Sequence, residues 1–218
     1  MSDPASAARE ALDARLTASL DATLIEAGRL AGGWLACRPG CAECCIGPFP
    51  ISRLDAERLR AGLLTIEQAD PAGAAAVRRR AEQACRLFAE GFPGDPGTGR
   101  FNDDDRAADA FLARHGRMPC PALVPESGHC ALYDYRPVSC RTFGPPVRLG
   151  EEALPPCRLC FVGAPPAEVE RCRVEPDREG LEEALLAAWP DQGKWETLIA
   201  FALRGETAAS SGTDSPGR

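Results

Sequence analysis

The chain has 218 residues, 44% of them hydrophobic, so it is long enough to bury a core and we expect a globular protein. Its net charge of −7 argues against general affinity for nucleic acid or anionic lipid, because both need a concentrated basic surface. No apolar run approaches the roughly 20 residues that span a bilayer, and the first residues lack the pattern of a secretory signal. We therefore expect a cytoplasmic protein that binds neither nucleic acid nor membrane.

The N-terminal segment is predicted to form one long helix from residue 4 to about 31. Pro4 suits a first helical position, and Gly32 and Gly33 would end the helix. Apolar residues recur at helical spacing along this segment. They are Leu12, Leu16, Leu20 and Leu24, widened by Ala8, Ala27 and Leu30.

Two further helices are predicted before residue 91. Ser52 is a good cap for a helix to about Leu64, with Asp55 at the capping-box position. The next helix runs from about Pro71 to Glu90. One of its faces is apolar and consists of Val77, Ala81, Ala84 and Phe88. A small thiol beside such a stripe is usually buried as an apolar residue, and we expect this of Cys85.

Glycine and proline dominate the segment from 91 to 99, which predicts a loop. Asn102 is expected to cap a helix that starts with three aspartates, whose charges favour the positive end of the helix dipole. The helix should end near His115 and Gly116, where His115 would place a favourable charge on the dipole.

From Met118 to about Pro176 the chain is rich in proline and cysteine, and no helical stripe persists. A turn between residues 123–124 and 131–133 predicts a short β-hairpin, with His129 in a solvent-facing turn. Two closing helices are marked by apolar residues, which are Leu181, Ala184, Leu185 and Ala188 in the first and Trp195, Leu198, Ile199 and Ala202 in the second.

The expected fold is therefore mainly α: a helical domain with two irregular cysteine-rich metal-binding segments and one short β-hairpin. We expect residues 1–204 to form a single domain whose cysteine-cluster part covers about 35–160. The remaining residues, 205–218, are rich in Ser, Thr and Gly and are predicted to be a disordered tail.

The eleven cysteines are the strongest functional signal. Their count is odd, and a disulfide between the adjacent Cys44 and Cys45 would be strained, which together with the expected compartment argues against disulfides. Thiolates are preferred ligands of zinc and of iron–sulfur clusters, which favour cysteines two or three residues apart in Gly/Pro-rich turns. Nine cysteines are candidate metal ligands, namely Cys37, Cys41, Cys44, Cys45, Cys120, Cys130, Cys140, Cys157 and Cys160.

Nine thiols exceed the needs of one tetrahedral ion, and the side chains of Cys44 and Cys45 diverge in most backbone conformations. Either one of these two faces the core, or they serve different ions of a multi-metal site; we favour the second. Cys172 could join the set. Thiolates carry negative charge, which nearby cations should offset. The candidates are Arg38, Arg136, Arg141 and Arg158.

The sequence resembles the YkgJ-type cysteine-cluster proteins, described as zinc- or iron-chelating with a CxxCxxCC motif and distantly related to flagellin lysine methylases. The resemblance is carried by Cys41-Ala-Glu-Cys44-Cys45 and by Gly128-His-Cys130-Ala-Leu-Tyr133-Asp-Tyr-Arg136-Pro137-Val-Ser-Cys140-Arg141-Thr-Phe143. It implies as ligands Cys37, Cys41, Cys44, Cys45, Cys120, Cys130 and Cys140, with Cys157 completing eight. One departure is that Cys37 and Cys41 are separated by three residues, where the family pattern has two.

Within the same stretch, Arg136 and Pro137 are expected to build a rigid turn whose guanidinium holds carbonyls or thiolates, and Tyr133 and Tyr135 to serve in packing. The favoured function is a metal-binding protein that holds zinc or iron through clustered thiolates. The alternatives are an iron–sulfur-dependent enzyme, redox or methyltransferase-like, and a metal-stapled protein-interaction module. The sequence does not decide whether the protein is an enzyme.

Overall fold

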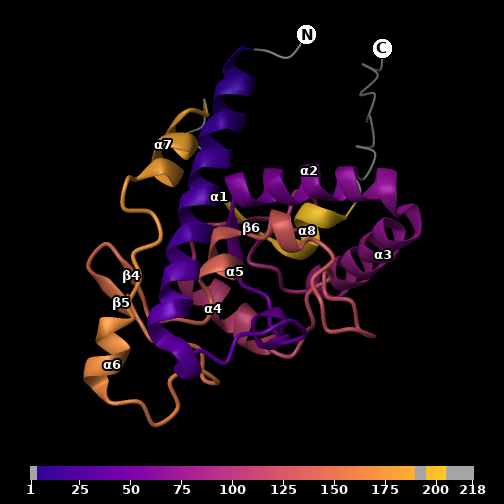
Figure 1. The fold of residues 1–218 in the computed structure, drawn as a ribbon. Coiled ribbons are helices and arrows are strands. Elements are labelled where there is room, and N and C mark those ends of the chain that lie inside the picture. Colours follow the sequence, from indigo (N-terminus) through magenta and orange to yellow (C-terminus); the bar gives the residue numbers. More distant parts are fainter. Residues whose placement is uncertain (1–3, 190–194, 205–218) are drawn as a thin grey trace, which may run out of the picture.

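The structure is a computed structural model that describes residues 4–189 and 195–204 (Figure 1). Its α-helices are α1 (Pro4–Ala31), α2 (Arg53–Ala69), α3 (Pro71–Phe88), α4 (Asp105–Arg114), α5 (Val138–Thr142), α6 (Pro166–Arg171), α7 (Leu181–Ala187) and α8 (Ile199–Leu203). Short 3₁₀ turns cover Gly32–Trp34, Glu43–Cys45 and Tyr133–Tyr135. The mainly α prediction is confirmed. The domain boundary at 204 stays a prediction, and the predicted tail lies outside the described residues.

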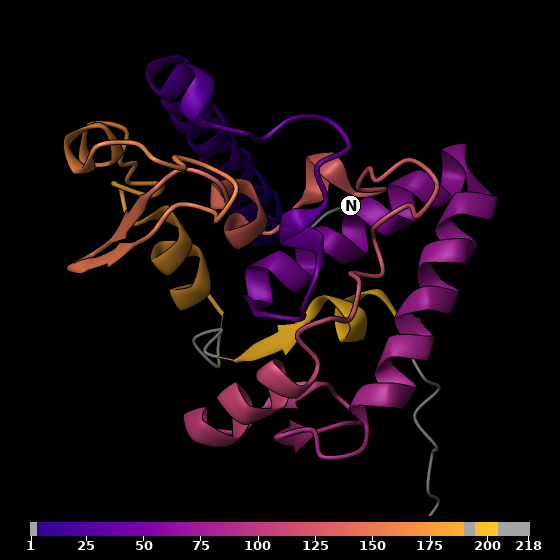
Figure 2. The same ribbon diagram turned by 90° about the horizontal axis from the view of Figure 1, so that it is seen from below.

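The strands are short and pair in three antiparallel two-stranded sheets. They are β1 (Pro50–Ser52) with β6 (Glu196–Leu198), β2 (Gly94–Asp95) with β3 (Arg100–Phe101), and β4 (Val147–Leu149) with β5 (Glu152–Leu154). Figure 2 shows these strands in separate parts of the molecule, with no continuous sheet on which helices could form layers. The short ladders close loops, and helix packing supplies most of the core.

Helix α1 spans the predicted 4–31 and lies beside α7 (Figure 1). Leu16 and Leu20 are fully buried and pack with residues of α2, α5 and α7, as the leucine stripe predicts. The two ends of the stripe were predicted wrongly, because Ala8 is exposed and Leu30 is 41% exposed. Ala27 and Ala31 near the C-terminal end are buried and pack with Val147 and Phe161, so the buried face continues there through the alanines.

Helices α2 and α3 form a hairpin that packs on α8 and builds the largest core cluster. The Ser52 side chain accepts a hydrogen bond from the Asp55 backbone N–H at 3.3 Å, so the predicted cap is confirmed. The helix continues to Ala69, five residues beyond the predicted end at Leu64. The predicted apolar face of α3 is buried, as is Cys85.

The start of α4 differs from the prediction by two residues. Asp104 caps the helix by accepting a hydrogen bond from the Ala107 N–H at 3.0 Å. Asn102 instead accepts from the Asp104 N–H, which forms the turn that leads into the helix. The helix ends at Arg114, close to the predicted His115.

His115 does not carry the charge that the sequence suggested. Its ring lies 5.0 Å from the ring of Phe88 and 4.5 Å from that of Phe111. Burial, with a smaller contribution from Arg114, lowers the pKa of His115. The imidazole is therefore favoured in its neutral form and belongs to an aromatic cluster.

The last predicted helix is shorter than expected. Residues 196–198 form strand β6, which pairs with β1 in the register Ser52↔Glu196 to Pro50↔Leu198. Thr197 is buried and donates a hydrogen bond to the Gly99 carbonyl at 2.7 Å, which holds this segment extended. Only Ile199–Leu203 is helical. The predicted helix before it is α7, with Leu181 and Leu185 buried but Ala184 exposed.

The cysteine-rich segment is largely irregular, but it contains α5, α6 and the β4–β5 hairpin, none of which the sequence predicted. The predicted hairpin is reduced to a single bridge between Leu123 and Cys130. A backbone hydrogen bond of 2.8 Å from Val124 to His129 supports it, and His129 is exposed in the turn as expected. In the described ranges, no helix combines the length and apolar character needed to cross a membrane.

Candidate metal centre

The first two cysteine-bearing segments meet as neighbouring extended chains. The Cys120 N–H donates to the Cys45 carbonyl at 2.7 Å, and the Gly47 N–H donates to the Met118 carbonyl at 2.8 Å. Between these bonds, Ile46 and Pro119 form an antiparallel bridge. The backbone pairing thus brings Cys44 and Cys45 beside Cys120, although some 75 residues separate them.

A glycine contact brings the Cys130 turn against the same segment. Gly128 has φ +70°, and a Cβ atom there would lie 2.9 Å from the Gly40 carbonyl oxygen. Such a distance is too short for a side chain, so the two backbones approach this closely only because residue 128 is a glycine. The turns that carry Cys41 and Cys130 are held together in this way.

The last cysteine turn is attached by backbone hydrogen bonds. The Cys157 N–H donates to the Gly144 carbonyl at 3.0 Å, and the Phe161 N–H donates to the Trp34 carbonyl at 2.7 Å. Inside the turn, the Cys160 N–H donates to the Cys157 carbonyl at 2.8 Å. Cys157 and Cys160 are therefore placed beside the segment that follows α1.

All eleven cysteines are free thiols. The nine candidate ligands lie in two groups, as their mutual electrostatic contacts show. The four-cysteine group consists of Cys37, Cys41, Cys157 and Cys160. The five-cysteine group consists of Cys44, Cys45, Cys120, Cys130 and Cys140. Whether these thiols ligate a metal stays a prediction; the structure shows how they are placed.

In the four-cysteine group, the Sγ atoms of Cys37 and Cys160 are 4.0 Å apart. Burial, together with Cys160, Cys41 and Cys157 in that order of effect, raises the pKa of Cys37 to about 12. Cys37 is an exposed residue, and its sulfur lies close to the backbone of Gly144, where an added Cβ would lie only 2.8 Å from it.

The five-cysteine group lies deeper. Cys120, Cys130 and Cys140 pack against the largest core cluster. Burial raises the pKa of Cys120 to about 12 and is also the main cause of the raised pKa values of Cys130 and Cys140. These thiols are therefore protonated in the metal-free chain at neutral pH.

Cys44 and Cys45 do not diverge, which corrects the expectation from sequence. A 3₁₀ turn over Glu43–Cys45 brings both side chains to the five-cysteine group, and they hydrogen-bond to each other. This bond lowers the pKa of Cys44 to about 6 and raises that of Cys45. The two neighbours face one centre, so the prediction that they serve different ions is not supported by their placement.

The candidate ligands are all thiols, which suits a thiophilic metal, but they do not yet surround a common point. Within residues 4–189 and 195–204, no three His, Cys, Asp or Glu side chains are already arranged to hold a metal ion. In a tetrahedral zinc site with Zn–S bonds of about 2.3 Å, neighbouring sulfurs are about 3.8 Å apart. The Cys37–Cys160 separation of 4.0 Å is close to that value. This pair of sulfurs is therefore already at a separation that one zinc ion could bridge.

The arginines near the thiols have different roles. Arg136 is a cation beside Cys44 and Cys130 and favours their ionised forms. Its Nε donates to the Tyr133 carbonyl at 2.8 Å, and its guanidinium covers the Tyr133 ring. The predicted rigid turn is confirmed, but Tyr133 is 59% exposed and is not the packing residue that the sequence suggested. Tyr135 does pack against the largest core cluster.

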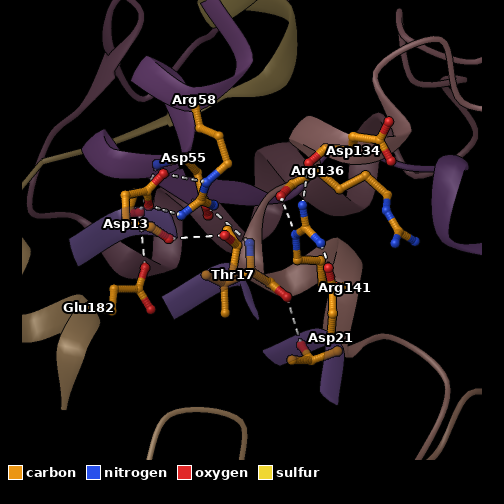
Figure 3. Close-up of polar contacts among 12 residues, drawn as sticks. Asp13, Thr17, Asp21, Asp55, Arg58, Asp134, Arg136, Arg141 and Glu182 are labelled. Carbon is orange, nitrogen blue, oxygen red and sulfur yellow. Dashed lines mark hydrogen bonds and ion pairs between the residues drawn. The ribbon is translucent and has the colours of Figure 1, made fainter. Parts of the chain in front are cut away.

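Arg158 pairs with Glu43, with Nη2 and Oε2 2.9 Å apart, and so links the Cys157 turn to the Cys44 turn. Within the part of the chain that the structure describes, Arg38 donates to the nearby Ala36 carbonyl. Arg141 was expected to offset thiolate charge, but its guanidinium is committed elsewhere. Figure 3 shows it between the Asp21 carboxylate and the carbonyls of Asp134 and Arg136. These bonds anchor α1 to the loop before Cys140.

A buried ion-pair network positions α5, and the sequence reading missed it. Arg58, 6% exposed, pairs with Asp55 and with Asp13 of α1 (Figure 3). The Asp55 carboxylate also accepts a hydrogen bond of 3.0 Å from the Val138 N–H at the start of α5, which carries Cys140. The sequence did contain a signal for this network: Asp55 and Arg58 are three residues apart and so share one face of α2, which is buried. The network thus positions the helix that carries Cys140, and the Asp55 charge also contributes to the raised pKa of that thiol.

The remaining cysteines are buried outside the two groups. Cys85 lies in the aromatic cluster with Phe88 and Phe92, as expected of a small apolar residue. Cys172 is 1% exposed and packs in the same apolar cluster as Cys160 and Phe161. Neither histidine joins the thiol groups.

Comparison with known proteins gives a family but no close relative. No curated protein and no solved structure matches the chain significantly. The family model "CxxCxxCC: Putative zinc- or iron-chelating domain" matches residues 36–160, more than half of the chain and the part that carries all nine candidate ligands. This agrees with the resemblance predicted from the cysteine motifs. The chain belongs to the CxxCxxCC family.

Proposed function

We propose that this protein binds zinc or iron at two sulfur-only centres, one in each cysteine group. The four-cysteine group supplies four thiols to one centre, which is the number that a tetrahedral ion takes. The five-cysteine group supplies four ligands and one further thiol to the other. Family membership supports zinc or iron chelation by the chain.

The observation that carries the proposal is the placement of nine free thiols in two compact groups inside one irregular scaffold. Free thiols rarely gather around one another without a metal or a disulfide, because each buried thiol gains little from polar neighbours. Their raised pKa values mark them as desolvated, and a cation would stabilise the thiolate form that desolvation disfavours. Among the described residues, Arg136 is a cation that favours the thiolate forms of Cys44 and Cys130, and a bound metal ion would act in the same direction.

The role of the protein would depend on which metal the thiols hold. Sulfur-only coordination leaves zinc no open position for water, so a zinc-loaded centre would be structural or a site of storage. The excess of thiols and the depth of the five-cysteine group favour, as a second candidate, an iron–sulfur cluster, which is also held by cysteine thiolates. A redox enzyme would follow from the second candidate and a stapled scaffold from the first.

The test is purification of the full chain without oxygen, followed by elemental analysis and a visible spectrum. Two zinc ions per chain in a colourless protein would support two zinc centres. Iron with acid-labile sulfide and broad visible absorption would assign a cluster to the chain. A chain that holds neither metal when isolated anaerobically, and takes up neither on reconstitution, would refute the proposed function.

A further inference from the structure

In the four-cysteine group, one close approach of two sulfurs joins distant parts of the chain. Cys37 follows α1 and Cys160 follows the β4–β5 hairpin, and their Sγ atoms are 4.0 Å apart. Cys37 is an exposed residue, whereas Cys160 is 4% exposed and packs in an apolar cluster. The pair thus combines a residue that solvent reaches with a buried partner.

From this arrangement we infer that the four-cysteine group is a peroxide-sensitive switch in which Cys37 and Cys160 form a disulfide and metal is released. The inference rests on the proposed function, because it concerns the metal held by this group. A disulfide has an S–S length of about 2.05 Å, so the two sulfurs must approach by about 2 Å. Gly144 lies against the Cys37 sulfur and has no side chain to obstruct that rotation.

The chemistry requires a hydroperoxide as oxidant. The Cys37 thiolate attacks one peroxide oxygen, the O–O bond breaks, and Cys37 becomes a sulfenic acid while hydroxide leaves. The Cys160 thiolate then attacks the Cys37 sulfur, forms the S–S bond and displaces a second hydroxide. Two sulfurs lose two electrons in total, and one peroxide is reduced to two hydroxides, which protons convert to water.

The consequence for metal follows from ligand count. After the disulfide forms, Cys41 and Cys157 are the only thiolates left in the group, and two sulfur ligands cannot saturate a tetrahedral ion. In the five-cysteine group, Cys120, Cys130 and Cys140 are packed against the core, which should slow their reaction with peroxide.

The experiment uses the full chain loaded with zinc under anaerobic conditions and then exposed to stoichiometric hydrogen peroxide. Zinc release is followed with a chromophoric chelator, and disulfides are mapped by mass spectrometry of non-reduced peptides. We expect one zinc per chain to be released as the Cys37–Cys160 bond appears, and both changes to reverse on adding dithiothreitol and zinc. A bond between Cys157 and Cys160, or release without any disulfide, would overturn the inference.

Two variants separate the switch from simple ligand loss. Cys37→His keeps a possible zinc ligand but cannot form the disulfide, and we expect its zinc release by peroxide to be at least about tenfold slower than in the wild type. Cys172→Ala removes a buried thiol near Cys160 and should behave like the wild type. If the wild-type chain takes up neither zinc nor iron, the proposed function fails. If it takes up iron but no zinc, the proposed function stands and the zinc-release switch fails. If it takes up zinc but peroxide releases it equally fast from wild type and Cys37→His, the switch alone fails.

Discussion

The two cysteine groups consist of the same residue type in opposite surroundings. The five-cysteine group is continuous with the main core, since three of its members pack against the cluster built by α2, α3 and α8. The four-cysteine group lies at the junction of loops after α1 and after β5, and its member Cys37 is exposed. Packing therefore couples the five-cysteine group to the stability of the main core, whereas the four-cysteine group combines an exposed member, Cys37, with a buried one, Cys160.

The largest effect is expected from removing a ligand in the core. Cys130→Ser should lose the metal of the five-cysteine group, and with metal at a thousandfold excess over its Kd this loss costs about 4 kcal/mol of unfolding free energy. Cys157→Ser should lose the metal of its own group but leave the melting temperature of the core much less changed. Thermal unfolding with parallel metal determination measures both. Equal destabilisation by the two variants would show that the groups do not differ as described.

Metal affinity should depend on pH in a definite direction. The raised pKa values mean that bound metal displaces protons from thiols, so affinity falls as pH is lowered and rises as pH is raised. Each displaced proton changes affinity about tenfold per pH unit, or about a thousandfold for three protons.

The pH slope can also separate the groups. A thiol whose pKa is raised stays protonated from about pH 6 to about pH 8 and releases one proton when it binds metal, however far its pKa is raised. Cys44 of the five-cysteine group, whose pKa is lowered to about 6, is largely ionised over this range and releases little. We therefore expect a shallower slope for the five-cysteine group in chelator competition over this range. A steeper slope for that group would contradict this ordering.

The buried ion-pair network around Arg58 should affect the stability of the core and the five-cysteine group, and not the four-cysteine group. Asp55→Ala leaves Arg58 buried with one partner fewer and removes the acceptor of the Val138 N–H, which is expected to cost about 3–5 kcal/mol. Asp103→Ala, an exposed aspartate before α4, is the matched control and should change stability by less than about 0.5 kcal/mol. Urea unfolding compares them. A small effect of Asp55→Ala would remove the network from the account of Cys140.

A glycine variant tests the placement of Cys37 in the four-cysteine group. Gly144→Ala would place a methyl group 2.8 Å from the Cys37 sulfur and should weaken zinc binding by the four-cysteine group about tenfold or more. Gly150 also has a positive φ, of +58°, but nothing lies within 4 Å of its added Cβ. Gly144 itself has φ +135°, so Gly144→Ala adds backbone strain to the contact with the sulfur, whereas Gly150→Ala controls for an added methyl group at a positive φ in open space. Zinc titration compares the two variants. Equal affinities would refute the placement of Cys37.

The smallest effect is expected at the ion pair that links the two groups. Arg158 is 74% exposed, so its pair with Glu43 should contribute less than about 1 kcal/mol to stability. Arg158→Gln should leave metal content unchanged, and high salt should mimic the substitution. A loss of metal from both groups in this variant would show that the link is structural.

Regular elements were predictable where a local pattern fixed them. The leucine stripe identified α1, and the apolar face from Val77 to Phe88 identified α3. Strand β6 was missed because its last residue, Leu198, begins an apolar run with helical spacing. The strand forms only by pairing with Pro50 and Ser52 of β1, which are far away in the sequence. The strand propensity of a short segment cannot reveal a pairing strand some 145 residues away in the sequence.

The candidate site was predictable in composition but not in arrangement. Spacing identified the nine cysteines, yet their division depends on the pairing of Cys45 with Cys120 and on the attachment of Cys157 to Gly144. These backbone contacts have no signature in local spacing. The glycines at 128 and 144 were the signal that could have suggested close approach beside the cysteines.

The most direct test of the account is the metal content of two double variants beside the wild type, all reconstituted anaerobically with zinc. Cys157→Ser with Cys160→Ser disables the four-cysteine group, and Cys120→Ser with Cys130→Ser disables the five-cysteine group. Two separate centres predict that each double variant binds one zinc fewer than the wild type and keeps the other. If either double variant lost all of its zinc while still folded, or lost none, the division of the thiols into two centres would be contradicted.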